Sequence, residues 1–295
     1  MSIHNKIVVI LGPTASGKTD LSIKLAKKYN GEVISADSRQ VYKGMDIGSG
    51  KITKKEMAGI PHYLLDVANP KRRFTVAQYQ KLALKAIKNI QRKNKLPILV
   101  GGTGFYIQSV VDGTVIPEVK PNWELRKKLG KIALPELVKR LANLDPVRAR
   151  VIDQNNPRRV IRALEIALVT GKAVPQPSFK GQFDTLQIGI KKSPEELKKL
   201  INKRLLKRLK TNAMINEVKK LHKNLSWKRL EEFGLEYRFV AQYLQNKITK
   251  EEMISSIQIE SEHFAKRQMT WFKRDKKIHW IKNFQEAEKL AKDFL

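Results

Sequence analysis

The sequence predicts an α/β fold in which a parallel sheet core carries an all-helical insertion domain. Short apolar runs typical of buried strands alternate with longer segments of helical period, and this alternation is typical of a parallel sheet. The runs are residues 6–11, 32–36, 63–67, 97–101, 186–190 and 278–282. Residues 121–181, in contrast, contain no strand pattern and are interrupted by prolines, so we expect this stretch to be helical.

The first apolar run leads directly into a phosphate-binding loop. The string GPTASGKT is a complete G-x-x-x-x-G-K-[ST] motif, in which backbone N–H groups surround phosphate oxygens. Lys18 supplies a positive charge, and the Thr19 hydroxyl can hold Mg²⁺. The core is therefore predicted to be P-loop NTPase-like and to bind a diphosphate. The expected diphosphate-binding residues are Gly12, Pro13, Thr14, Ala15, Ser16, Gly17, Lys18 and Thr19.

Capping signals place the helices that connect the strands. The helix after the phosphate loop is expected to stop at Gly31. Thr75 and Gln78 form a capping box, which opens a helix expected to run to about Asn94.

The best-defined helix of the insertion runs from Arg158 to Thr170. Asn156 is its predicted N-cap, a proline takes the first helical position, and Gly171 is its predicted stop. Arg158 and Arg162 share one face. The residues expected to face a core are Val160, Leu164, Ala167 and Leu168.

These patterns divide the chain into two predicted domains. The composition changes after Pro117, so we assign residues 1–118 and 183–295 to the core domain and residues 119–182 to the helical insertion domain.

Composition restricts the classes of function. The chain has 59 Lys and Arg against 28 Asp and Glu, a net charge of +31. This excess favours a polyanionic partner such as a nucleic acid, although a general lysine bias with solvated side chains would give the same count. The absence of cysteine excludes disulfides, thiolate nucleophiles and zinc–thiolate sites. No apolar run approaches the roughly 18 residues of a membrane span, so we expect a cytoplasmic protein.

Polar residues follow two further strands of the predicted sheet. In an open parallel sheet, ligands bind outside the carboxyl ends of the strands. Asp37 follows the second run and could bind Mg²⁺ through water, act as a general base or cap the next segment. Thr103 lies between glycines after the fourth run and could meet a ligand or merely form a tight turn. Asp66, after Leu64 and Leu65, resembles the hydrophobic-run-plus-Asp element of nucleotide hydrolases.

Six motifs together resemble the tRNA dimethylallyltransferase family, in the same order and over nearly the whole chain. They are GPTASGKT from residue 12, DSRQVYKGMDIG from 37, PHYLLD from 61, GGTGFY from 101, NPRRVIRALE from 156 and AKRQMTWF from 265. The resemblance implies that the loop holds dimethylallyl diphosphate with Mg²⁺. It also implies that the five-carbon group passes to N6 of adenosine 37, which flips out of the anticodon loop of the tRNA.

The resemblance also implies roles for individual residues. Asp37 is the expected base that takes the proton of the adenine amine, Thr103 contacts the adenosine, and Thr19 holds the metal. The residues expected to bind tRNA are Asp37, Ser38, Arg39, Gln40, Thr103, Arg158, Arg159, Val160, Ile161 and Arg162. We expect the protein to be a monomer.

Other basic residues are weaker candidates. Arg204 and Arg208 resemble arginines that approach the diphosphate in some members. The helical spacing predicts that Arg267, Trp271 and Arg274 share one face, which would be either a stacking surface for tRNA or a core tryptophan beside solvated arginines. Glu262 stands where many members have arginine, so the phosphate contact of those members is not carried over to this position.

Two other classes of function share some of these features. A P-loop small-molecule or nucleoside kinase would use the same loop, Mg²⁺ and Asp37, but it would not need the net charge or the basic insertion. A non-enzymatic RNA-binding protein could retain the loop without catalysis, but the set of intact site residues argues against it: Lys18, Thr19, Asp37 and Thr103.

Overall fold

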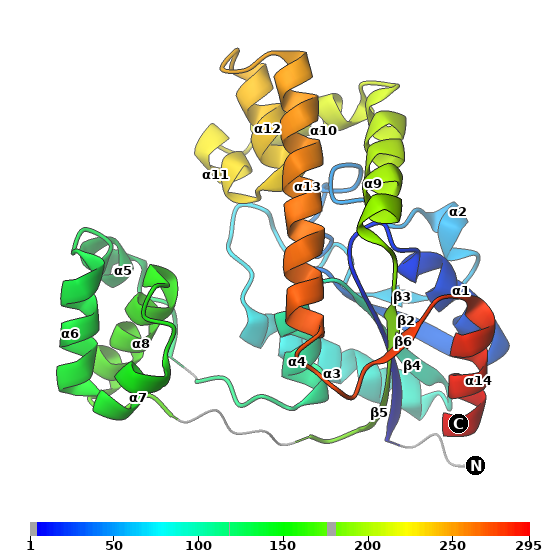
Figure 1. Cartoon of the computed structure of the whole chain (residues 1–295), viewed down its shortest axis with the longest axis horizontal. Helices are drawn as coiled ribbons and strands as arrows, with labels where there is room; N and C mark the ends of the chain where they lie inside the picture. The colour runs from blue at the N-terminus through cyan, green and yellow to red at the C-terminus, as the bar shows by residue number, and fades with distance from the viewer. Residues whose placement is uncertain (1–4, 118, 176–180) are drawn as a thin grey trace. The chain divides into compact units, whose positions relative to one another are not determined.

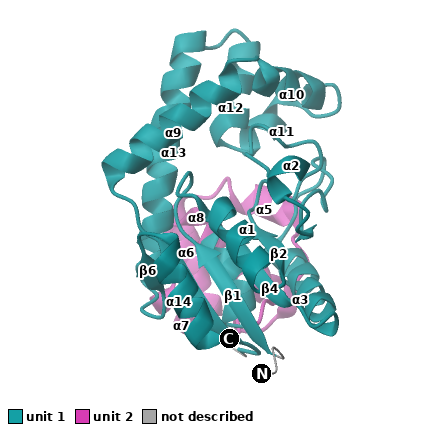
Figure 2. Cartoon of the chain, turned by 90° about the vertical axis from the view of Figure 1, so that its right-hand side faces the viewer, with its two compact units in different colours: residues 1–113, 181–295 teal, residues 114–180 magenta. Residues whose placement is uncertain are grey.

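The computed structural model describes residues 5–117, 119–175 and 181–295. Contacts divide the chain into two compact units, unit 1 with residues 1–113 and 181–295 and unit 2 with residues 114–180 (Figure 2). The expected domain boundaries, 118–119 and 182–183, fall close to these limits; residues 118 and 176–180 lie outside the described residues. Within the described ranges, no helix combines the length and apolarity needed to cross a membrane.

Unit 1 is built on one six-stranded sheet in which every paired strand is parallel. The strand order is β3-β2-β4-β1-β5-β6. The strands are β1 (Lys6–Leu11), β2 (Gly31–Ala36), β3 (His62–Tyr63), β4 (Leu96–Gly101), β5 (Asp184–Ile190) and β6 (His279–Ile281). The predicted α/β class with a parallel sheet is confirmed. β3 is shorter than predicted because Leu64 (φ 63°) and Asp66 (φ 57°) turn the chain out of the sheet.

Helices cover both faces of the sheet. Helices α1 (Lys18–Lys28) and α14 (Phe284–Phe294) bury apolar side chains on one face, whereas α3 (Val76–Arg92) and α4 (Gly104–Val111) pack on the other (Figure 1). The predicted stop at Gly31 is wrong, since α1 ends at Lys28 and Gly31 opens β2. A Cβ at Gly31 would lie 2.8 Å from the Ile98 side chain and 3.0 Å from the Leu96 carbonyl oxygen, so a larger residue there would push against the neighbouring strand.

Five helices form a lobe of unit 1 outside the sheet, which we call the helical lobe. They follow β5 and stand above the carboxyl end of the sheet in Figure 1. The helical lobe consists of α9 (Pro194–Leu209), α10 (Ala213–His222), α11 (Trp227–Glu232), α12 (Leu235–Leu244) and α13 (Lys250–Phe272). The short helix α2 (Lys54–Met57) lies in the long connection between β2 and β3.

Unit 2 is helical in its described residues and has its own apolar core. Its helices are α5 (Trp123–Leu129), α6 (Leu134–Leu144), α7 (Pro146–Val151) and α8 (Pro157–Thr170). As predicted, Asn156 caps α8 and Gly171 ends it in the left-handed conformation (φ 64°). The expectation that Leu168 faces the core is wrong, because its side chain is 49% exposed. Ala163 and Ile166 complete the buried face instead.

Candidate active site

Three neighbouring strands end at the same level and bring their loops together. β4 lies between β1 and β2, and its last residue, Gly101, pairs with both Leu11 and Ala36. The phosphate loop, the segment from Asp37 and the segment containing Thr103 therefore leave the sheet side by side. This is the edge at which parallel sheets bind ligands.

The phosphate loop has the backbone conformation that its glycines permit. Gly12 (φ 148°) and Gly17 (φ 93°) adopt angles that other residues rarely take, and Gly17 precedes the first turn of α1. Lys18 folds back over the loop, where its ammonium donates to the carbonyls of Gly12 (3.0 Å) and Pro13 (2.6 Å). The loop and the N-terminus of α1 together direct positive charge toward an anion.

The ammonium of Lys18 has an unusually low proton affinity. Burial, with a contribution from the positive charge of Arg204, lowers the pKa of Lys18 to about 7, and the Asp37 carboxylate opposes this shift. A bound anion would favour the charged form. The site is therefore suited to a ligand that brings negative charge with it.

Two hydroxyls of the loop fit a phosphate and its metal. Ser16 Oγ is buried and has no hydrogen-bond partner, so a phosphate oxygen would satisfy it. Thr19 is exposed at the start of α1. Among the residues that the structure describes, no group of three or more His, Cys, Asp or Glu side chains could hold a metal ion. A Mg²⁺ ion here would depend on Thr19, phosphate oxygens and water, which are ligands that Mg²⁺ accepts.

Asp37 is held by its own segment. Its Oδ1 accepts hydrogen bonds from the N–H groups of Arg39 (2.8 Å) and Gln40 (3.3 Å). Within residues 5–117, 119–175 and 181–295, Oδ2 has no hydrogen bond. One oxygen thus fixes the orientation of the carboxylate, and the other is left to accept a proton from a ligand.

Thr103 ties two of the loops together. Its N–H donates to the carbonyl of Ala36 (3.1 Å), and its hydroxyl oxygen accepts from the N–H of Ser38 (3.0 Å). The hydroxyl proton remains available to a ligand. Thr103 therefore lies beside the Asp37 segment, as the alignment of the strand ends requires.

Two arginines of α9 reach the loops from the helical lobe. The Arg204 guanidinium donates to the Thr14 hydroxyl (2.6 Å), and burial, followed by the charge of Arg208, lowers the pKa of Arg204 to about 10. Arg204 remains charged at neutral pH and lies at the phosphate loop. Arg208 pairs with Glu236 (3.2 Å) and donates to the Gly48 carbonyl (3.3 Å), so it holds a neighbouring loop.

The site is thus an anion-binding loop, a carboxylate with one available oxygen and a threonine, all at adjacent strand ends. A model of the IPP transferase family matches residues 40–275. The chain belongs to the IPP transferase family. It is 41% identical to the tRNA dimethylallyltransferase of Halothermothrix orenii, over 99% of this chain and 94% of that protein. The identity to that of Anoxybacillus flavithermus is also 41%, over 94% and 90% of the two chains.

Solved structures agree with this assignment. The tRNA isopentenylpyrophosphate transferase of Bacillus halodurans is 36% identical, with a TM-score of 0.73 over 98% of this chain and 94% of that one. A eukaryotic dimethylallyltransferase acting on tRNA gives a TM-score of 0.80 at 28% identity, over 98% of this chain and 77% of that one.

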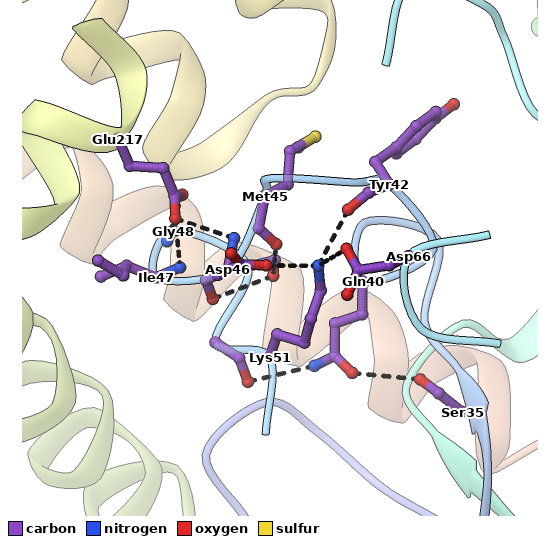
Figure 3. Close-up of polar contacts among 12 residues, drawn as sticks. Ser35, Gln40, Tyr42, Met45, Asp46, Ile47, Gly48, Lys51, Asp66 and Glu217 are labelled. Carbon is purple, nitrogen blue, oxygen red and sulfur yellow. Dashed lines mark hydrogen bonds and ion pairs between the residues drawn. The ribbon is translucent and has the colours of Figure 1, made fainter. Parts of the chain in front are cut away.

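A loop next to the Asp37 segment is held by a carboxylate of the helical lobe (Figure 3). Glu217 accepts hydrogen bonds from the N–H groups of Asp46 (2.9 Å), Ile47 (2.7 Å) and Gly48 (3.1 Å). The Tyr237 hydroxyl donates to the same carboxylate (2.8 Å). The loop that follows the Asp37 segment is therefore fixed by a residue about 170 positions away in the sequence.

The predicted resemblance of Asp66 to a nucleotide-hydrolase carboxylate is wrong. Asp66 lies just beyond β3, at the edge of the sheet, and β2 and β4 separate β3 from β1 and its phosphate loop. Its carboxylate pairs with the ammonium of Lys51 (2.6 Å), which is almost fully buried and also pairs with Asp46 (2.6 Å; Figure 3). Asp66 therefore has a structural partner and no contact with the phosphate loop.

The other residues of the Asp37 segment use their side chains within the fold. Arg39 Nε donates to the Phe233 carbonyl (2.6 Å). The Gln40 amide accepts from the Ser35 hydroxyl (3.1 Å) and donates to the Gly50 carbonyl (3.2 Å). These contacts hold the segment in place beside the site.

The tRNA-binding residues predicted on α8 differ in exposure. Arg158 and Arg159 are exposed, whereas Val160 is fully buried in the core of unit 2 and Ile161 is half-buried. Arg162 donates to the Val119 carbonyl (2.9 Å) and pairs with Glu165, so much of its guanidinium is engaged internally. Arg159 lies 3.7 Å from Asp153, but both partners are exposed. Arg158 and Arg159 are thus the members of this set most open to a ligand.

The C-terminal candidates do not share one helical face. α13 ends at Phe272, so Arg274 lies beyond the helix and the predicted face is wrong. Trp271 packs against the backbone of Gly104 and lies edge-on to Phe105, with ring centres 6.4 Å apart. Arg267 is exposed and 3.8 Å from Glu260, and Glu262 is half-buried on the same helix.

Two residues near the site carried no signal of function in the sequence. Glu217 looks like an ordinary helical glutamate, and Gln268 lies within a family motif without any residue pattern that predicts its contacts. Both act on loops more than 160 positions away, and only the folded structure brings them together.

Proposed function

We propose that this chain transfers the dimethylallyl group from dimethylallyl diphosphate to N6 of adenosine 37 in tRNA and releases diphosphate. The observation that carries the proposal is the pairing, at adjacent strand ends, of a diphosphate-binding loop with a carboxylate whose Oδ2 is available. The names of the relatives support the substrates, and the net charge of +31 suits a tRNA.

Each residue of the site has a role in this reaction. The bond between the allylic carbon and the diphosphate oxygen breaks, the adenine nitrogen bonds to that carbon, and Asp37 Oδ2 takes the amine proton. The amine is a weak nucleophile because its lone pair is delocalised into the ring, so proton removal assists it. Lys18, Arg204 and the loop amides stabilise the charge that develops on the leaving diphosphate.

Magnesium belongs to the proposal as a partner of the donor. The residues fit it, since the Thr19 hydroxyl is exposed at the loop and the unpartnered Ser16 Oγ can bind an oxygen of the phosphate that would share the metal. When bound by Thr19 and the phosphate oxygens, Mg²⁺ would neutralise charge on the diphosphate.

The tRNA contacts are proposed at two places in the chain. The Asp37–Gln40 segment and Thr103 would surround the flipped adenosine, and Arg158 and Arg159 would bind backbone phosphates from unit 2. Arg162, Val160 and Ile161 would support that surface mainly by holding α8 in its unit. We place the protein in the cytoplasm as a monomer.

Mass spectrometry of nucleosides tests the proposal. An unmodified anticodon stem-loop is incubated with the protein, Mg²⁺ and dimethylallyl diphosphate, and we expect prenylated adenosine. If no product forms and ATP is consumed in a parallel reaction, the kinase alternative replaces the proposal. If no product forms although the RNA binds tightly, a binding protein or another donor replaces it.

A further inference from the structure

Gln268 of α13 joins two loops of the site. Its side-chain Nε2 donates to the carbonyl of Gly102 (2.9 Å), and its Oε1 accepts from the N–H of Thr14 (2.8 Å). Gly102 immediately precedes Thr103, and Thr14 lies within the phosphate loop. The two ends of one buried amide, 6% exposed, therefore hold the loops that follow β4 and β1.

The surroundings are shaped around this amide. A Cβ at Gly102 would lie 2.2 Å from Gln268 Nε2, so a larger residue there would displace the amide from its present position. On the other loop, Arg204 donates to the Thr14 hydroxyl, so two helices of the helical lobe hold Thr14. The paired register of β1 and β4 ends at Leu11 and Gly101, so strand pairing does not fix the loops beyond it.

Docking of α13 does not explain a glutamine at this position. Apart from the small Ser261, the other buried residues of α13 are apolar: Met253, Ile257, Ala265 and Phe272. An apolar residue at 268 would bury more apolar surface and would avoid the cost of burying an amide. The amide is satisfied only because both loops supply partners, so its presence depends on the loops.

We propose that Gln268 is a positioning residue that sets the spacing between the phosphate loop and the Thr103 loop. This inference rests on the proposed function, in which one loop holds the donor and the other contacts the acceptor. Gln268 acts through Thr14 and Gly102 and touches neither reacting atom. Its loss lets the two loops move relative to each other, and small misplacements of reacting groups cost much rate.

Substitution of Gln268 separates positioning from stability. Gln268→Met keeps the length and volume of the side chain but removes both hydrogen bonds. In steady-state prenylation of the stem-loop, we expect kcat to fall by about 10–100-fold, with the KM of each substrate within about threefold of wild type. Gln268→Glu keeps the acceptor for Thr14 but turns a carboxylate oxygen toward the Gly102 carbonyl, so we expect at least an equal fall.

Gln187→Met is the matched control. Gln187 is also buried, in the middle of β5, and donates to Asp275 (3.0 Å) away from the loops. We expect this variant to lose a similar amount of thermal stability and to keep its kcat. If Gln268→Met keeps kcat within about threefold, or if Gln187→Met loses as much kcat, the positioning role is overturned.

A double-mutant cycle of Gly102 and Gln268 tests the inference without the methionine variant. Gly102→Ala places a methyl group where Gln268 Nε2 lies, so we expect it to lower kcat. In the background of Gln268→Ala, which itself lowers kcat, the same change should cause little further loss, and additive losses would overturn the inference. Wild-type protein in the same assay separates the two proposals, because absence of wild-type product would instead refute the proposed function.

Discussion

Asp37 has the geometry of a proton acceptor, because its two carboxylate oxygens differ in their hydrogen bonds. Oδ1 accepts two backbone hydrogen bonds that set the orientation of the carboxylate, whereas Oδ2 has none within the described ranges. Asp37→Asn keeps an oxygen for the backbone but cannot take a proton. We expect the single-turnover rate to fall by about 10²–10⁴-fold, while the tRNA Kd stays near that of wild type. A parallel loss of tRNA affinity would mark Asp37 as a binding or structural residue.

We expect Lys18 to make donor binding at the proposed site depend on pH. Because burial lowers its pKa to about 7, the free protein loses the Lys18 proton as the pH rises through neutrality. An anionic donor favours the charged form, so binding must take up a proton above that pH. We expect the affinity for dimethylallyl diphosphate to fall as the pH rises from 7 to about 9, by up to about tenfold per unit.

Isothermal titration calorimetry of donor binding, with Lys18→Met as the control, tests whether Lys18 causes this pH dependence. The variant should bind the donor more weakly and should lose the part of the pH dependence that Lys18 causes, so what remains is the titration of the ligand itself. Proton uptake measured in two buffers should be larger in wild type. Identical pH profiles for the two proteins would exclude Lys18 as the group that titrates.

Among the elements, the connection between β2 and β3 is shaped by a helix far away in the sequence. Glu217 of α10 satisfies three consecutive N–H groups of the loop (Figure 3). Glu217→Ala leaves these groups without their acceptor, so we expect the free energy of unfolding, measured by urea titration, to fall by about 3 kcal/mol. Tyr237→Phe keeps the carboxylate but removes a hydroxyl that donates to Glu217 and accepts from the N–H of Ser49 (3.1 Å). It leaves one loop N–H without its acceptor where Glu217→Ala leaves three, so its cost should be smaller, about 1 kcal/mol. Equal costs would show that the carboxylate does not hold the loop.

The elements also show what the sequence encodes locally. The phosphate loop, the capping box at Thr75 and the Asn156 cap were predictable because each depends on residues within a few positions. The meeting of Asp37 and Thr103 followed from the rule that parallel strands end together. The shortness of β3 was not predictable. It depends on positive φ angles at Leu64 and Asp66, and neither residue is a glycine, the residue type that would indicate such angles.

Long-range contacts within the site were the part that the sequence could not supply. The partners of Gln268 lie 166 and 254 positions away. No periodicity or spacing relates such residues, and only packing of the helical lobe brings them to the loops. The same cause explains Leu168, whose exposure depends on how unit 2 fills its core with neighbouring side chains.

For the whole molecule, the charge of +31 leads us to expect tRNA binding with a steep salt dependence. Each side chain that neutralises a phosphate contributes to the slope of log Kd against log salt, whereas solvated lysines do not. Arg158 is exposed on α8, and its removal should weaken binding and reduce the magnitude of that slope by about one. Lys292→Ala, which removes the same charge from an exposed position on α14 in unit 1, should leave the slope unchanged. Filter binding of the anticodon stem-loop over a range of salt concentrations measures both, and equal slopes for the two variants would mean that Arg158 contributes only to the general charge.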